Sequence, residues 1–304
     1  MTSPKKRSLR LPAFAKINLC LHVMGRRQDG YHELRTIFQA ISLHDTLDLS
    51  ITPGSSALQV SLQCSDPALP VGPENLVFRA IEAISREIGF QGRVSVYLEK
   101  KIPVARGLGG GSSDAAAAMI GMLRLTKIKL PLARQIEIAS SLGADVPFFL
   151  FGGRALAVSR GDEIYPLPDL PRRTILVVSP KDVGVRTKDA YQWISAELTN
   201  RAEAPRIAGF CALCWSRLGR GVSNDFEGPV FRRHPRLGEI RAGLLRGGAA
   251  DAALAGSGSA VFGVFRNPAQ ARRAARTFPE DSIFVVETLS REKYGRSLAW
   301  RVTG

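Results

Sequence analysis

The glycine-rich segment 103–114 is the strongest constraint that this sequence places on its own fold. It reads Pro-Val-Ala-Arg-Gly-Leu-Gly-Gly-Gly-Ser-Ser-Asp and leads directly into the alanine-rich stretch 115–119, which is predicted to be helical. Glycines without a Cβ can adopt left-handed conformations and bring backbone N–H groups close to an anion. Ser112 or Ser113 is expected to cap the helix, whose first turn attracts negative charge. The segment is therefore predicted to bind phosphate groups.

The alternative interpretation of this segment is a flexible glycine loop that happens to precede a helix. The segment differs from the two common phosphate motifs, because no lysine follows the glycines and three of them are contiguous. Its order, Pro-x-x-x-Gly-Leu-Gly-Gly-Gly-Ser-Ser-Asp-Ala-Ala-Ala, resembles the second signature of the GHMP small-molecule kinases, named for their galactose, homoserine, mevalonate and phosphomevalonate members. Other parts of the chain must support this resemblance.

Length and composition are those of a globular protein. A chain of 304 residues with 45% hydrophobic and 23% charged residues is expected to form two domains, divided as 1–170 and 171–304 at the proline-rich stretch 166–171. No apolar run approaches the roughly 20 residues of a membrane span, and the basic N-terminus is followed by no apolar signal region. We therefore expect a soluble, cytoplasmic protein that does not contact a membrane.

The four cysteines do not form a disulfide framework in a chain of this length, so we expect reduced thiols. Cys211 and Cys214 form one Cys-x-x-Cys pair within a predicted helix over 207–218. Neither a second cysteine pair nor a histidine cluster accompanies them, so no protein-bound metal site is predicted.

The net charge of +15, from 42 Lys and Arg against 27 Asp and Glu, is the main indication of a nucleic-acid partner. The arginines, however, occur in short scattered groups without interleaved aromatic residues or a recognisable reading helix. We therefore predict no nucleic-acid partner and interpret most of these residues as solvated surface. An enzyme with two polyphosphate substrates also gains from a positive field.

Periodicity predicts an α+β fold in which strands dominate the first 52 residues. The predicted strands are 11–23, 35–43, 45–52, 92–99, a hairpin over 154–166, 174–179, 250–255, 260–265 and 282–287. The predicted helices are 74–88, 115–126, 131–142, 188–198, 235–246 and 268–278, with mixed helix and loop over 201–230. The alternation after residue 235 is typical of a ferredoxin-like unit.

Two polar residues, Lys16 and Asp145, stand in apolar surroundings and are candidate catalytic residues. Lys16 lies within an apolar strand, where an ammonium group is costly without an anionic partner, and Asn18 has the same parity and shares its face of the sheet. The alternative is that Lys16 reaches water from the strand edge. Asp145 follows a predicted helix and precedes an apolar run, so helix capping is the alternative to a catalytic role. A carboxylate beside a lysine can accept a proton from a substrate hydroxyl.

A second small-residue turn, Gly256-Ser257-Gly258, joins two predicted strands. Its simplest interpretation is a glycine hairpin. Its backbone N–H groups could also close over phosphates from the second domain.

Six blocks in order carry a resemblance that runs from about Ala13 to Val286. They are Lys-Ile-Asn-Leu, Gly-Tyr-His-Glu-Leu, the glycine loop, Gly-Ala-Asp-Val-Pro-Phe-Phe, Asn-Asp-Phe-Glu and Gly-Ser-Gly-Ser. The chain resembles the GHMP kinases, and the first and fourth blocks together resemble the member that acts on a cytidine diphosphate sugar alcohol. The resemblance implies an N-terminal ribosomal-protein-S5-like domain and a C-terminal ferredoxin-like domain. It also implies ATP-dependent phosphorylation of the 2-hydroxyl of 4-diphosphocytidyl-2-C-methylerythritol, in the non-mevalonate route to isoprenoid precursors.

The same resemblance assigns roles to individual residues. Asp145 resembles the general base and Lys16 its partner, while Asn18, Tyr31 and His32 resemble the cytidine diphosphate side, where Tyr31 could stack on the base and His32 hydrogen-bond it. The turn over 256–258 is assigned to the substrate. Mg²⁺ is expected on the ATP phosphates, with Ser112 or Ser113 as a candidate ligand. The residues assigned to ATP are Pro103, Val104, Ala105, Arg106, Gly107, Leu108, Gly109, Gly110, Gly111, Ser112 and Ser113.

Two positions depart from the family pattern. Arg106 stands where the family usually has glycine or alanine, and either a phosphate contact or a solvent-facing side chain would explain it. Ala255 replaces a common threonine, so a phosphate hydrogen bond from that position is in doubt.

Three alternative functions stay open: another GHMP kinase such as a homoserine or mevalonate kinase, an inactive binding module, and a basic nucleic-acid-binding protein. The presence of both Lys16 and Asp145 disfavours the inactive module. The expected oligomeric state is a monomer or a weak homodimer.

Overall fold

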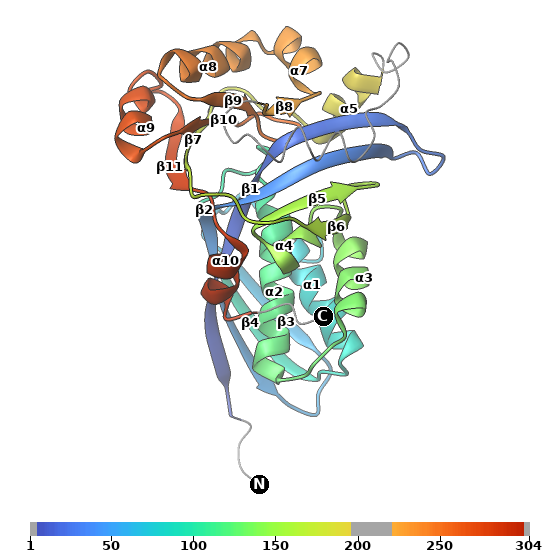
Figure 1. The fold of residues 1–304 in the computed structure, drawn as a ribbon. Coiled ribbons are helices and arrows are strands. Elements are labelled where there is room, and N and C mark those ends of the chain that lie inside the picture. Colours follow the sequence, from blue (N-terminus) through green and yellow to red (C-terminus); the bar gives the residue numbers. More distant parts are fainter. Residues whose placement is uncertain (1–4, 196–220, 301–304) are drawn as a thin grey trace.

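The computed structural model describes residues 5–195 and 221–300, which form two packed sheets with helices on their outer faces (Figure 1). The first sheet has the order β3-β4-β2-β1-β8, and β5 and β6 extend it from β2. Its centre is a long antiparallel hairpin of the first two strands. The strands are β1 (Arg7–Arg26), β2 (His32–Pro53), β3 (Gln59–Cys64), β4 (Gly92–Glu99), β5 (Arg154–Val158), β6 (Glu163–Pro166) and β8 (Ser223–Asn224).

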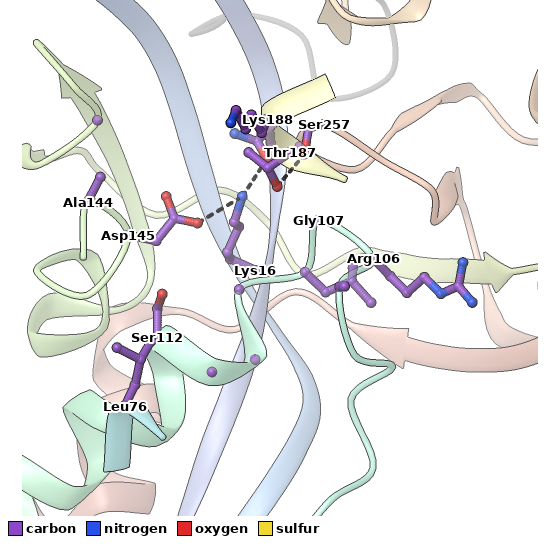
Figure 2. A pocket seen from close by; sticks show the side chains of 18 of the residues that line it. Lys16, Leu76, Arg106, Gly107, Ser112, Ala144, Asp145, Thr187, Lys188 and Ser257 are labelled. Carbon is purple, nitrogen blue, oxygen red and sulfur yellow. Dashed lines mark hydrogen bonds and ion pairs between the residues drawn. The ribbon is translucent and has the colours of Figure 1, made fainter. Parts of the chain in front are cut away.

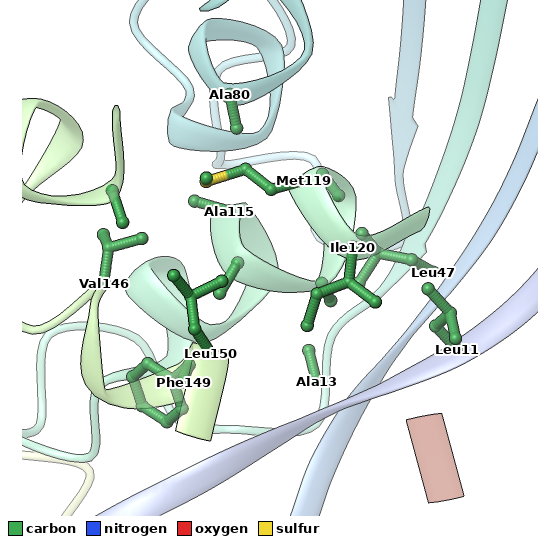
Figure 3. Close-up of a cluster of buried hydrophobic side chains, with 14 of the residues drawn as sticks. Leu11, Ala13, Leu47, Ala80, Ala115, Met119, Ile120, Val146, Phe149 and Leu150 are labelled. Carbon is green, nitrogen blue, oxygen red and sulfur yellow. The ribbon is translucent and has the colours of Figure 1, made fainter. Parts of the chain in front are cut away.

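Helices cover one face of this sheet and enclose the larger part of the core. The alanine-rich helix α2 approaches the sheet closely, so that Ile120 packs against Leu11 and Leu47 (Figure 3). Small side chains permit this approach, as at Gly121, where an added Cβ would lie 2.6 Å from Leu49. The helices are α1 (Leu76–Glu87), α2 (Gly110–Thr126), α3 (Leu132–Leu142), α4 (Phe148–Phe151) and α10 (Arg291–Leu298).

The second sheet is antiparallel, with the order β11-β7-β10-β9. Its inner face packs on the first sheet through a shared apolar cluster that includes Ile17, Ile37, Val177 and Phe262. Its strands are β7 (Thr174–Ser179), β9 (Asp251–Leu254), β10 (Val261–Phe265) and β11 (Ser282–Glu287). The helices on this side are α5 (Thr187–Ser195), α7 (Glu227–Arg233), α8 (Pro235–Arg246) and α9 (Pro268–Ala275).

The α+β prediction is confirmed, and so is nearly every predicted element within the described residues. The two strands expected over 35–43 and 45–52 are one strand, β2, because β1 pairs along its whole length. The edge strand β3 and the polar helix α10 were not among the predicted elements, although β3 alternates polar and apolar residues as a strand does. The division at residue 170 stays a prediction. Two elements that follow residue 170 belong to the first layer, since β8 pairs with β1 and α10 joins the core of the first sheet.

Two smaller expectations are wrong. Helix α2 begins at Gly110, and its N-cap is Gly109 with a φ of 72°, so neither Ser112 nor Ser113 caps it. Cys20 is disulfide-bonded rather than reduced, whereas Cys64 is a free thiol.

The helix predicted over 207–218, with Cys211 and Cys214, lies outside the described residues. Within the described part of the chain, no helix has the length and apolar character needed to cross a membrane.

Replacing Ile120 by alanine should lower the free energy of unfolding by about 2–5 kcal/mol, because the side chain is fully buried and its removal leaves a cavity. Urea denaturation followed by circular dichroism measures this loss. Ile128→Ala is the matched control, since Ile128 is 41% exposed and its replacement should change stability by no more than about 0.5 kcal/mol. Equal losses in the two variants would contradict the packing described.

Candidate active site

A cavity of about 1080 Å³ lies between the two layers. Its wall is built from segments that are distant in the sequence (Figure 2). They are the glycine loop, β1, the β1–β2 turn, the segment before α4, helix α5 and the 256–257 turn. Of the residues predicted from the sequence, all line the cavity except Ser113 and Gly258. Segments far apart in the chain therefore meet around one space.

The glycine loop forms one wall of the cavity and carries the N-terminus of α2. Gly107 and Gly109 have positive φ values of 79° and 72°, which glycine adopts without strain. The side chain of Ser112 lines the cavity, whereas Ser113 is buried and its Oγ has no hydrogen-bond partner. Residues 109–112, which include the start of α2, line this space, and the first turn of a helix leaves N–H groups without intrahelical partners, so the wall suits an anion.

Lys16 and Asp145 meet inside the cavity, as the sequence predicted (Figure 2). The Lys16 Nζ atom lies 3.4 Å from Asp145 Oδ2, with side-chain exposures of 5% and 34%. Lys16 Nζ also donates to Asn18 Oδ1 at 2.8 Å, which confirms that the two residues share a face. Bulges in β1 flank residues 16–18 and aim these side chains. The ammonium is thus buried with two oxygen partners, and snorkelling to water is excluded.

Asp145 is not a helix cap. Helix α4 begins after Pro147, and no side-chain hydrogen bond caps it. The carboxylate instead faces the cavity, so one of its two predicted roles, capping, is wrong.

Aromatic side chains form a further part of the cavity wall, with Tyr31, His32 and Tyr191 among the lining residues. Tyr31 is 56% exposed, and the guanidinium of Arg160 lies 5.1 Å from its ring centroid. The His32 ring stacks on Tyr191 with centroids 4.8 Å apart, and its Nε2 atom lies 2.7 Å from Ser195 Oγ. Burial and, secondarily, Arg26 lower the pKa of His32, which favours the neutral imidazole. This aromatic part of the cavity wall suits a planar base that needs stacking and hydrogen bonds.

The 256–258 turn reaches the cavity from the second layer. Its Ser257 Oγ lies 3.1 Å from Thr187 Oγ1, and Asn224 Nδ2 donates to the carbonyls of Leu254 and Gly256. The turn sits tightly against the glycine loop, since a Cβ on Gly107 would lie 1.9 Å from the Ala255 carbonyl oxygen.

A buried charged cluster under the glycine loop was missed from the sequence. Lys100 Nζ contacts Asp45 and lies 2.7 Å from Asp114 Oδ2. Burial first of all, together with the neighbouring Asp45 and against the opposing effect of Lys100, raises the pKa of Asp114 to about 8. Asp114 ends the recognised motif, so its position was available as a signal. Its partners, in contrast, come from β2 and from the residue that follows β4.

Three further cavity residues, Arg160, Thr187 and Tyr191, were also missed. They carry no motif, and only the folded chain brings them to Tyr31, Ser257 and His32.

Comparison with known proteins gives a consistent result. Residues 75–153 match the family description "GHMP kinases N terminal domain", and residues 207–282 match "GHMP kinases C terminal". A homoserine kinase from Cytophaga hutchinsonii superimposes with a TM-score of 0.71 at 18% identity, covering 95% of this chain and 96% of that one, which shows a shared fold. The chain is a GHMP kinase, an ATP-dependent phosphotransferase.

Two proteins with higher sequence identity show which group of GHMP kinases the chain belongs to. The 4-diphosphocytidyl-2-C-methyl-D-erythritol kinase of Solibacter usitatus is 43% identical over 301 residues, covering 97% of this chain and 92% of that protein. A crystal structure of 4-(cytidine 5'-diphospho)-2C-methyl-D-erythritol kinase is 37% identical with a TM-score of 0.76, covering 92% and 99% of the two chains. The chain belongs to the 4-diphosphocytidyl-2-C-methyl-D-erythritol kinase family.

Replacing Gly107 by alanine should destabilise the protein by about 2 kcal/mol or more, because a positive φ strains the new residue and its Cβ overlaps the Ala255 carbonyl. Differential scanning calorimetry measures the loss. Gly111→Ala is the matched control, since its Cβ would meet only Leu76 at 3.8 Å and a helical alanine gains about 0.5–1 kcal/mol over glycine. A Gly107→Ala protein as stable as the Gly111→Ala protein would disprove the close contact between loop and turn.

Proposed function

We propose that this chain transfers the γ-phosphoryl group of ATP to the 2-hydroxyl of 4-diphosphocytidyl-2-C-methyl-D-erythritol. The observation that carries the proposal is the set of groups that line one cavity. An anion-binding loop, the Lys16–Asp145 ion pair and the neighbouring residues Tyr31 and His32 all contribute to its wall. The named relatives support the same reaction.

The glycine loop is the proposed site of the ATP phosphates. Backbone N–H groups of the loop and of the first turn of α2 would bind the phosphate oxygens. Among the described residues, no group of three His, Cys, Asp or Glu side chains is placed to hold a metal ion. We therefore propose that Mg²⁺ is held chiefly by the phosphates and that it neutralises their charge. Ser112 is the better-placed hydroxyl ligand, because Ser113 does not line the cavity.

Asp145 is the proposed general base. The substrate hydroxyl oxygen forms a bond to the γ-phosphorus while the bond to the β–γ bridging oxygen breaks, and its electron pair leaves with ADP. The hydroxyl proton passes to the Asp145 carboxylate, which is accessible from the cavity. Lys16, fixed by Asn18, orients this carboxylate and stabilises the negative charge that develops on the oxygen.

Tyr31, His32 and Asn18 form the proposed acceptor end of the cavity. A cytosine ring can stack on the exposed Tyr31, and His32 can hydrogen-bond the base edge through Nδ1, because its Nε2 contacts Ser195. The 256–257 turn would approach the diphosphate with its N–H groups. Both substrates are small molecules, and we propose that the protein acts on them in the cytoplasm, without nucleic acid, as a monomer or weak homodimer.

The identity of the acceptor can be tested directly. Purified protein with ATP and 4-diphosphocytidyl-2-C-methyl-D-erythritol should release ADP and form a phosphate monoester, detected by a coupled ADP assay and ³¹P NMR. Homoserine and mevalonate serve as competing acceptors, and neither offers a base to Tyr31 and His32. Turnover of mevalonate without turnover of the cytidine substrate would reverse the assignment.

Replacing Asp145 by asparagine should reduce kcat by about 10²–10⁴-fold, because the acceptor hydroxyl loses its base. The dissociation constant of ATP, measured by calorimetry, should change by less than about threefold, since Asp145 is assigned to the acceptor side. Asp48→Asn is the matched control, because Asp48 lies on the surface and pairs with Arg10. An Asp145→Asn enzyme with the kcat of the wild type would rule out the proposed base.

A further inference from the structure

Arg106 joins the glycine loop to the second layer of the protein. Its Nη1 atom donates to the Val183 carbonyl and, at 2.6 Å, to Ser259 Oγ. The Ser259 hydroxyl in turn donates to the same carbonyl at 2.7 Å. The main chain adds a further link, since Ala260 N donates to Arg106 O at 3.2 Å. One loop residue is therefore held by two segments of the second layer.

Of the two roles expected for Arg106, the solvent-facing side chain is wrong because its head group is hydrogen-bonded to protein, and the phosphate contact stays a prediction. Its side chain extends away from Lys16 and Asp145 (Figure 2), and its partly buried head group donates to protein acceptors through Nη1. Ser259 is fully buried, so this contact lies inside the protein. Hydrogen bonds from a charged donor are roughly twice as strong as neutral ones.

The loop around Arg106 needs such an anchor. Ala105, Gly107 and Gly109 all have positive φ values, and Ala105 adopts its value of 55° without the freedom of glycine. Conformations of this kind persist where the surrounding structure fixes them. Arg106 lies between the first two of these residues, and the neighbouring Gly107 packs against the Ala255 carbonyl.

We propose that Arg106 is a positioning residue that sets the affinity for ATP without touching the nucleotide. By fastening the loop to Val183 and Ser259, it holds the N–H groups of the loop in the conformation that receives phosphates. The inference rests on the proposed function only in placing ATP at the glycine loop. The acceptor does not enter it.

The test is calorimetric titration of the intact protein with ATP, without acceptor. Arg106→Ala should weaken ATP binding by about tenfold or more, because the phosphate-binding conformation becomes one of several. The KM for ATP should rise in parallel, whereas kcat at saturating ATP should stay within about threefold of the wild type. Arg106→Lys, which retains a charged donor, should recover part of the affinity. Arg172→Ala is the matched control, because Arg172 is exposed and pairs with Glu287.

Ser259→Ala keeps the proposal testable even if Arg106→Ala does not fold. This change removes one acceptor of Arg106 and leaves the charge in place, so ATP binding should weaken by about threefold or more. If Arg106 instead bound phosphate directly, Ser259→Ala would leave the affinity unchanged, and that result overturns the proposal. An unchanged affinity in a folded Arg106→Ala protein overturns it as well. A wild-type protein that binds ATP but does not phosphorylate the cytidine substrate would refute the proposed function and leave this inference standing.

Discussion

The buried ammonium of Lys16 is the constraint on which the site depends. A charge removed from water must be compensated, and Lys16 finds its partners in Asn18 and Asp145. Asn18 in turn donates to Thr36, whose hydroxyl donates to the Cys20 carbonyl, so the chain of hydrogen bonds ties β1 to β2. One charge thereby fixes the direction of a carboxylate that comes from a different part of the chain.

The same residue also positions the glycine loop. The Lys16 backbone N–H donates to the Leu108 carbonyl at 2.9 Å, and the lysine side chain lies against Gly109. From the other layer, Ser259 binds the loop through Arg106, and Ala255 packs against Gly107. The loop is thus fixed from both sides of the cavity. This arrangement suits phosphoryl transfer, in which alignment and charge neutralisation supply most of the catalysis.

The features that could be predicted from the sequence are those that depend on residue spacing within one helix or strand. The apolar period of α1, the alternation of β4 and the shared face of Lys16 and Asn18 all follow from spacing along one element. The partners of Arg106, in contrast, lie 77 and 153 residues away, so spacing gave no sign of them.

The Asp45–Lys100 pair is separated by 55 residues and escaped prediction for the same reason. The capping error at α2 has a local cause. Glycine in a left-handed conformation starts the helix before the serines are reached.

Helix α10 completes the core of the first sheet from a late part of the chain. Tyr294 of this helix is buried beside Gly152, and its hydroxyl donates to the Phe149 carbonyl at 2.6 Å. Phe149 in turn backs Gly109 at the start of α2. Residues 291–298 are synthesised after the segments that they cover. The wall behind the glycine loop is therefore complete only once residues 291–298 have been synthesised.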